Sequence, residues 1–337
     1  MAPRRVLLLQ LDGKFPNLAL LRIAAHHRDL GDEVQLRHAG NVQALQRRLG
    51  EADPDAVYAS LIFTRTRPLG ETVTRTYPQA VMGGTGWDER TTLADAGIDP
   101  NGRLDYADYP RWTTSLGFTQ RGCRLKCPFC VVPRKEGAVR QTHTIGEIWR
   151  GDPHPRHVVL LDNDFFGQPE WAARIDELRA GGYRVSFSQG INARMLNDET
   201  AAALASVDYR DNQMRERRIY TAFDNRRDAR RFFAGLEALI RHGVRPRHLF
   251  IYMLIGYWPN ESSDDRLYRL KAIRDFGALP YPMPFRRTRE LVGFQRWVVG
   301  GYDHQVPWKD WEAADYQPTN LRLHERTAPL PLDGSTR

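Results

Sequence analysis

The chain has very little cysteine and no long hydrophobic run. Only three cysteines occur in 337 residues, at positions 123, 127 and 130, and they lie too close together to form a disulfide framework. Nowhere do eighteen apolar residues follow one another, so no transmembrane helix is predicted. The apolar run near the N-terminus ends at Asp12 and Lys14, and we therefore expect no export signal and a cytoplasmic protein.

Positive charge, in contrast, is in excess. The formal net charge is +8 at pH 7, and 41% of the residues are hydrophobic, enough to build the cores of about two domains. Arginines are dense over residues 226–231 and 286–296, the latter near Trp297, Trp308 and Trp311. Basic residues beside aromatic ones are typical of surfaces that bind nucleic acid. A solvated surface is nevertheless the preferred interpretation, because arginine is frequent throughout the chain.

The first hundred residues alternate short apolar runs with helical stretches. Strands are predicted over residues 5–11, 34–37, 56–63 and 80–82, and helices over 16–31, 42–49 and 69–77. This alternation implies right-handed crossovers and a parallel sheet. We therefore predict an open α/β, Rossmann-like domain over residues 1–100, followed by a polar linker over 101–112.

The same alternation resumes at residue 113. Strands are predicted over residues 115–119, 158–162, 183–187, 218–223, 248–255 and 280–285, with helices between them. Each strand ends in polar residues or glycine, at the edge where β/α barrels gather their sites. Six strands predict a partial (β/α)6 TIM-type barrel over residues 113–286. Residues 287–337 form a C-terminal extension that matches no motif, and we expect residues 328–337 to be disordered.

The three cysteines form the sequence CRLKCPFC, with CxxxCxxC spacing. One short loop thus supplies three thiolates, one fewer than a closed zinc site or a saturated four-iron cluster takes from cysteine alone. With its flanks, GFTQRG before and VVPRKEG after, this motif resembles the cluster loop of the radical S-adenosylmethionine (radical SAM) superfamily. The resemblance implies that Cys123, Cys127 and Cys130 hold a [4Fe-4S] cluster whose fourth iron binds S-adenosylmethionine.

The resemblance also implies an activity. In that family the reduced cluster cleaves S-adenosylmethionine, and the resulting 5′-deoxyadenosyl radical abstracts hydrogen from a substrate. An electron donor such as flavodoxin or ferredoxin is then a partner. From their places in the cysteine loop or at strand ends, the residues expected to bind S-adenosylmethionine are Phe129, Asp162, Asn163, Asp164, Gln189, Asn192, Asp224 and Gly256. Val131 and Val132 are expected to offer backbone groups to the adenine.

Two of these segments depart from the family pattern. Asp162, Asn163 and Asp164 stand where the family has a glycine-glycine-glutamate motif, and an ordinary helix cap explains such residues equally well. The segment YMLIGYWPNESSDD resembles the family's MxxGxPGExxxD stretch. Gly256 matches that stretch and would let the backbone approach the adenine closely, whereas Asn260 replaces its second glycine. Trp258 is interpreted as packing.

Residues 16–34 resemble the start of the cobalamin-binding-like domain that precedes many radical SAM cores. Where that family has a DxHxxG motif, this chain reads LDGKFPN and has no histidine. His26 and His27 lie on the following predicted helix, where we interpret them as solvated or packed. Cobalamin binding stays open, and a substrate-docking or structural module is the preferred interpretation.

The absence of further cysteines narrows the reaction. It excludes methylthiotransferases and maturases that carry auxiliary clusters, and methylases that use a separate cysteine as methyl carrier. Single-cluster chemistry on an unidentified substrate remains, with modification of tRNA or DNA as one alternative that salt-sensitive nucleic-acid binding would reveal. An alternative of another class is a non-catalytic nucleic-acid-binding protein stabilised by zinc, with a histidine such as His143 as fourth ligand.

Overall fold

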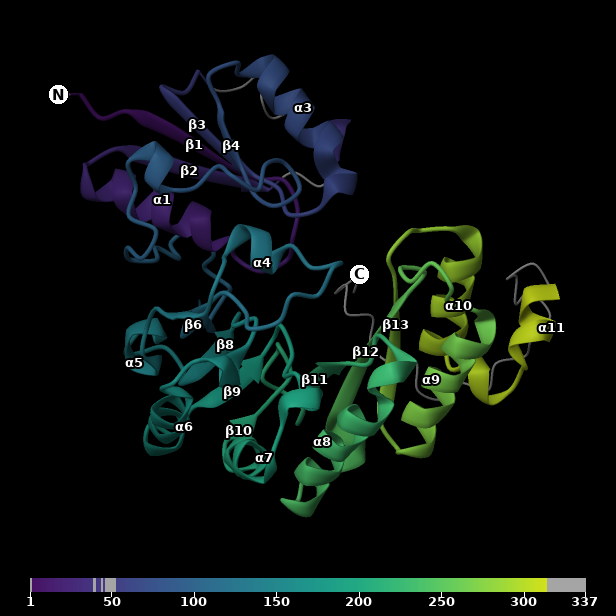
Figure 1. Ribbon diagram of the computed structural model, residues 1–337. Coiled ribbons are helices and arrows are strands. Elements are labelled where there is room, and N and C mark those ends of the chain that lie inside the picture. The colour runs from purple at the N-terminus through teal and green to yellow at the C-terminus, as the bar shows by residue number, and fades with distance from the viewer. Residues whose placement is uncertain (1, 39–40, 44, 46–52, 314–337) are drawn as a thin grey trace. The chain divides into compact units, whose positions relative to one another are not determined.

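The computed structural model describes residues 2–38, 41–43, 45 and 53–313. The chain divides into two compact units, Met1–Thr113 and Thr114–Arg337, and Figure 1 shows that both combine sheets with helices. The sheets of more than two strands are parallel throughout, which confirms the predicted α/β class. No helix within the described residues is long and apolar enough to cross a membrane.

The first unit is built on one four-stranded parallel sheet with the order β2-β1-β3-β4. Successive residues of the central strand face opposite layers, as the two-residue period of a strand requires. Val6 and Leu8 pack with Leu20 of α1, whereas Leu7 packs in a second core with Val73 of α3. The elements are β1 (Arg5–Gln10), α1 (Leu18–Asp29), β2 (Glu33–His38), β3 (Ala56–Ser60), α3 (Arg67–Thr76) and β4 (Val81–Gly83), with short 3-10 helices η1 (Thr64–Thr66) and η2 (Ala94–Ala96).

These elements lie close to their predicted ranges. Helix α1 begins after Asn17, whose side-chain oxygen accepts hydrogen bonds from the amides of Ala19 and Leu20, and this cap fixes the start of the helix. The predicted helix over residues 42–49 lies largely outside the described residues.

The segment predicted as a linker, residues 101–112, belongs to the first unit. Its Asp105 and Asp108 both pair with Arg28 of α1, at 3.1 and 2.7 Å. Tyr106 is buried, and the hydroxyl of Tyr109 donates to Gln10 at 2.5 Å. Its polar composition therefore reflects ion pairs with α1 rather than a free connection, and the boundary between the units follows Thr113.

The second unit contains all six predicted strands in two parallel sheets. The first sheet has the order β10-β9-β8-β5 and the second β11-β12-β13. The amide of Ile191, just after β9, donates to the carbonyl of Tyr220 in β11 at 2.7 Å, so the two sheets adjoin. The strands are β5 (Ser115–Gly117), β8 (His157–Leu160), β9 (Arg184–Phe187), β10 (Asp208–Tyr209), β11 (Ile219–Ala222), β12 (Leu249–Ile255) and β13 (Leu279–Pro284).

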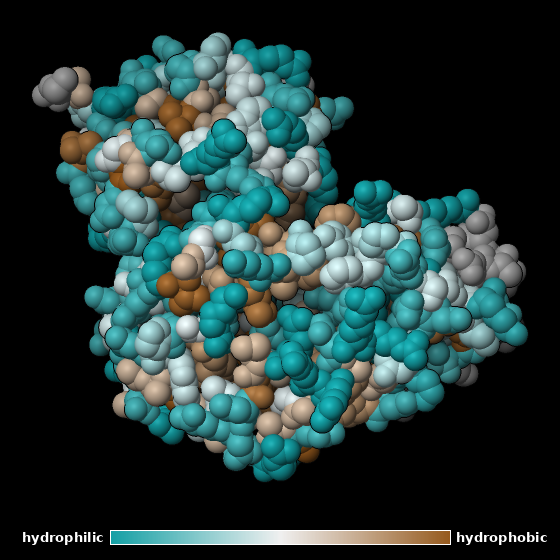
Figure 2. Space-filling model, in the orientation of Figure 1, coloured by the Kyte–Doolittle hydropathy of each residue, from teal (hydrophilic) through white to brown (hydrophobic). Residues whose placement is uncertain are grey.

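Helices follow most of these strands (Figure 1). They are α5 (Ile145–Ile148), α6 (Trp171–Ala180), α7 (Asp198–Ala205), α8 (Ala229–Arg241), α9 (Ser263–Asp275), α10 (Arg289–Val299) and α11 (Trp308–Ala313), with 3-10 helices η3 (Phe165–Gly167), η4 (Ala193–Met195), η5 (Arg226–Asp228), η6 (Pro246–His248) and η7 (Tyr302–His304). Helix α9 begins with a capping box in which Ser262 and Asp265 bond each other's backbone amides, an arrangement that satisfies two otherwise unpaired donors. Hydrophilic residues cover much of the face in Figure 2, with smaller hydrophobic patches among them.

The described part of the C-terminal extension is helical and contributes to the core of the second unit. Trp297, Trp308 and Trp311 are all buried, and the rings of Phe294 and Trp308 lie 5.1 Å apart. These tryptophans are therefore core residues, so the nearby arginines do not form a base-stacking surface with them. The segment predicted to be disordered lies outside the described residues.

Candidate functional site

The cysteine loop is closed at its base by a two-stranded antiparallel ladder. Strand β6 (Gln120–Arg121) pairs with β7 (Arg140–Gln141), and the loop between them contains all three cysteines and the short helix α4 (Val132–Lys135). Gly122 has φ +82°, and a Cβ there would lie 2.2 Å from the carbonyl oxygen of Ala138. Only glycine permits this approach without a backbone shift.

The three thiols are free and half-buried. The amide of Leu125 donates to the Cys123 sulfur at 3.4 Å, and the amide of Val132 donates to the Cys130 sulfur. Burial raises the pKa of both thiols, and the neighbouring thiols reinforce this effect because their negative charges repel one another. Holding Cys123 and Cys130 as thiolates therefore calls for a cationic group beside them.

The donor set fits an iron-sulfur cluster in number and chemistry. Three thiols from one loop, with backbone amides directed at two of the sulfurs, are the groups that hold and tune such clusters. As the side chains stand, however, no three His, Cys, Asp or Glu side chains of the described residues converge into a group that could hold a metal ion. Cluster binding would thus require the thiols to turn toward a common centre.

Two polar side chains that follow β8 bind the cysteine segment. Asp164 accepts hydrogen bonds from the amide, Nε and Nη2 of Arg124, at 3.1, 2.7 and 3.0 Å. Asn163 donates to Glu136 at 3.1 Å, and Glu136 also accepts from the amide of Gly122 at 3.0 Å. Both residues were predicted to contact S-adenosylmethionine, but here their side chains fix the loop that carries the cysteines.

Asp162 is buried, and it bonds the chain segment that leads into the same loop. Its carboxylate accepts the amide of Thr119 at 2.8 Å as well as the Thr119 hydroxyl. Burial raises the pKa of Asp162 to about 7, although the hydrogen bonds from Thr119 act in the opposite direction. Gln168 donates to the Thr119 hydroxyl at 2.7 Å. Asp162, which follows β8, thus holds the chain segment just before the first cysteine in place.

The residues predicted at the ends of β9 and β11 have varied surroundings. Gln189 is exposed. Asn192 caps η4 and accepts from the amide and Nε of Arg194, both at 3.2 Å. Asp224 accepts the amide of Leu254 at 2.8 Å, and burial raises the pKa of its carboxyl.

Gly256, at the end of β12, has φ +75°. Its amide donates to Glu261 at 2.5 Å, and Glu261 pairs with Arg269, with both side chains buried. Burial raises the pKa of Glu261, against the opposing effects of the Gly256 amide and Arg269. Gly256 therefore shapes a turn that is held together by a buried ion pair.

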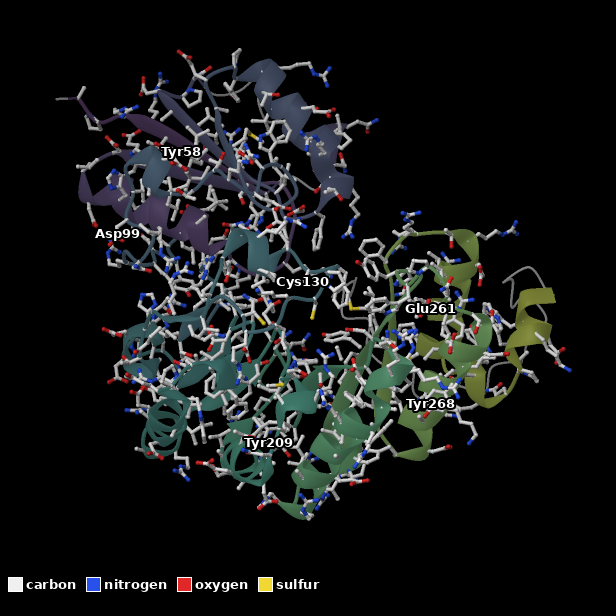
Figure 3. All side chains as sticks on the ribbon, viewed as in Figure 1. Tyr58, Asp99, Cys130, Tyr209, Glu261 and Tyr268 are labelled. Atoms are coloured by element: carbon white, nitrogen blue, oxygen red, sulfur yellow. The ribbon has the colours of Figure 1, made fainter. Side chains whose placement is uncertain are left out.

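Phe129 connects the cysteine loop to this turn. Its ring lies 5.3 Å from that of Tyr257 and 6.3 Å from that of Trp258, edge to face in both cases. Figure 3 labels Cys130 and Glu261, which belong to the cysteine loop and to the turn after β12. The structure thus brings the predicted loop and the predicted end of β12 together.

Arg194 was missed by the sequence reasoning. Its guanidinium contacts the Cys127 thiol and pairs with Asp228 at 2.7 Å. Burial acts to lower its pKa, but the hydrogen bonds to Asp228 and Cys127 outweigh this effect, so the pKa is raised. It is a cation held beside a candidate ligand thiol, and its only sequence signal was its position soon after the third predicted barrel strand.

A cavity of about 590 Å³ lies at the ends of β11 and β12, within the size range of small-molecule sites. Its lining includes Asp224, Trp258 and Glu261 but none of the cysteines. The cavity therefore adjoins the turn that Phe129 contacts.

Comparison with known proteins adds no assignment. No protein-family model matches the chain, and no curated protein matches it.

Proposed function

We propose that the chain is a radical SAM enzyme that uses one [4Fe-4S] cluster to cleave S-adenosylmethionine reductively and abstract hydrogen from a substrate. The observation that carries this proposal is the cysteine loop, in which one short segment supplies three free, half-buried thiols. A second observation supports the proposal. Three consecutive residues at the end of a parallel strand, Asp162, Asn163 and Asp164, hold the loop and the segment that leads into it through hydrogen bonds.

We further propose that the second unit is a partial (β/α)6 TIM-type barrel. The supporting facts are the two parallel sheets, the helices that follow their strands, and the hydrogen bond from Ile191 to Tyr220 where the sheets adjoin. In such a barrel the polar strand ends gather at one edge. The cysteine loop would lie at that edge.

The residues of the chain then have separate roles. Cys123, Cys127 and Cys130 would hold the cluster, which supplies one-electron chemistry when bound. Asp162, Asn163 and Asp164 position the loop. Arg194 places positive charge beside Cys127. Phe129 packs edge to face against Tyr257 and Trp258 beside the loop. Together with Asp162, Asn163 and Asp164, the proposed contacts to S-adenosylmethionine are Phe129, Gln189, Asn192, Asp224 and Gly256.

For the first unit we propose a docking or structural role rather than cobalamin binding. The loop after β1 carries no histidine, and its own contacts fill it. Gln10 donates to the carbonyls of Asp12, Gly13 and Phe15 at 2.9–3.2 Å. The carboxylate of Asp12 accepts the amides of Ile62 and Phe63.

Metal analysis tests the proposal against the zinc alternative. Protein reconstituted anaerobically should contain about four irons per chain, show the broad visible absorption of a cluster, and release 5′-deoxyadenosine on reduction with S-adenosylmethionine. Stoichiometric zinc without deoxyadenosine would refute the enzyme assignment.

A further inference from the structure

A row of aromatic rings leads from the cysteine loop to the protein surface. The Tyr257 ring lies 5.3 Å from Phe129, 5.1 Å from Trp258 and 4.9 Å from Phe285, edge to face in each case. Three separate chain segments supply these rings: the cysteine loop, the turn after β12 and the end of β13. Phe285 is 46% exposed, and Phe129 and Tyr257 are partly exposed, so the row presents aromatic rings to solvent.

Positive charges without counter-ions adjoin this row. Arg286 and Arg287 directly follow Phe285 and are exposed, and no ion pair within the described residues engages either of them. Lys126, in the cysteine loop, is likewise exposed. The nearest acidic residue in sequence, Glu290, is already paired with Arg266. This surface is therefore complementary to an anion that also carries flat, stackable groups.

The other arginine cluster has different surroundings. Arg226 lies 3.7 Å from Asp265, and its guanidinium stacks over Tyr268 at 4.2 Å. Arg230 and Arg231 are exposed on α8. Only the cluster after β13 directly follows an exposed ring of the row that begins in the cysteine loop.

We propose that the surface formed by Phe129, Tyr257, Phe285, Arg286 and Arg287 binds unpaired nucleotides of a nucleic acid. Bases stack on the rings and phosphates lie against the arginines, as in other single-strand binding surfaces. This inference rests on the proposed function. Because Phe129 lies between two of the cysteines in sequence, a base held on the row would be presented at the cluster site, and the substrate would be a nucleic acid.

The test measures binding of fluorescent 12-nucleotide strands, oligo-dT and oligo-rU, to the full-length reconstituted protein, beside a duplex of equal length. Phe285→Ala should weaken single-strand binding about fivefold or more, since each stacked base contributes substantially to affinity. Arg286→Gln with Arg287→Gln should lower the slope of log affinity against log salt by about 1.4, because each arginine that neutralises a phosphate of a single strand contributes about 0.7 to that slope. A preference between the two strands assigns the nucleic acid as DNA or RNA.

Matched control variants distinguish binding at this surface from the general electrostatic attraction of a nucleic acid to a basic protein. Tyr268→Ala removes an exposed ring on α9 that Figure 3 shows well away from Cys130. Arg230→Gln with Arg231→Gln removes the same charge from α8. Both controls should bind as the wild type does. Losses in the controls equal to those in the test variants, or duplex binding as tight as single-strand binding, would overturn the proposal.

The same preparations distinguish failure of this inference from failure of the proposed function. Iron and deoxyadenosine without ring-dependent binding would refute the nucleic-acid substrate and leave the radical SAM assignment intact. Ring-dependent binding without iron or deoxyadenosine would refute the enzyme assignment while the binding surface stands.

Discussion

Replacing Asp164 by alanine removes the clamp between β8 and the cysteine loop. Arg124 makes three hydrogen bonds to this carboxylate, two of them from its guanidinium. Each charge-assisted bond nominally contributes about 1.5–3 kcal/mol. The Arg124 side chain is 38% exposed, so water screens the pair and rehydrates the arginine in the variant. About 2–3 kcal/mol of loop stability should therefore be lost.

The loss should appear as faster release of iron. A cost of about 2–3 kcal/mol lowers the population of the closed loop about 30- to 140-fold, because 1.4 kcal/mol corresponds to a factor of ten. After anaerobic reconstitution, iron capture by an external chelator should be at least about tenfold faster in Asp164→Ala than in the wild type. The readout is the rate of iron release, with the urea midpoint measured in parallel.

Asp303→Ala is the matched control. Asp303 accepts two hydrogen bonds from Arg274, at 2.9 and 3.1 Å, and its side chain is 4% exposed, as is that of Asp164. It lies in η7 rather than beside the cysteine loop. A similar fall in urea midpoint is expected, with iron release unchanged. Wild-type iron release in Asp164→Ala, or equally fast release in both variants, would refute the clamp.

Three further predictions concern the backbone and the buried carboxyl. Gly122→Ala should lower iron content after reconstitution, because its Cβ would lie 2.2 Å from a backbone carbonyl oxygen; iron equal to wild type would contradict this. Gly256→Ala should cost about 1–3 kcal/mol in urea unfolding, mainly from φ +75°, and an unchanged midpoint would argue against the strained turn. Asp162 has a pKa of about 7 in the folded chain, above its unfolded value of about 3.9. The wild type should therefore lose stability relative to Asp162→Asn as the pH rises from about 4 to 7, and the loss should be on the order of 4 kcal/mol. A difference between the two proteins that is equal at pH 5 and pH 8 would count against a buried, titrating carboxyl.

Much of the fold could be predicted because its strands are apolar and its helices have recognisable starts. The continuous apolar run of β1 and the cap at Asn17 locate the first βα unit from local sequence alone. The β6-β7 ladder is only two residues per strand, too short to produce a periodic signal. In the sequence, residues 101–112 resemble a linker because they are polar. Their ion pairs with Arg28 form only in the folded chain, so the local sequence does not reveal them.

The candidate site likewise has features that the sequence predicts and features that it does not. The cysteine spacing is local and was evident in the sequence. The contacts of Asp164 with Arg124 and of Arg194 with Cys127 join distant parts of the chain, so no local pattern reveals them. Trp297 and its neighbouring tryptophans show what composition cannot reveal. Composition alone does not distinguish a buried ring from one that can stack on a base.

The most direct test of the central claim is the amount of 5′-deoxyadenosine formed from S-adenosylmethionine by reduced, reconstituted protein, with Cys127→Ala beside it. The account predicts reductive cleavage by the wild type and none by the variant, with the cluster absorption lost in parallel. Cleavage by the variant at the wild-type rate would show that Cys127 is not a ligand. The absence of cleavage by an iron-loaded wild type would contradict the proposed function itself.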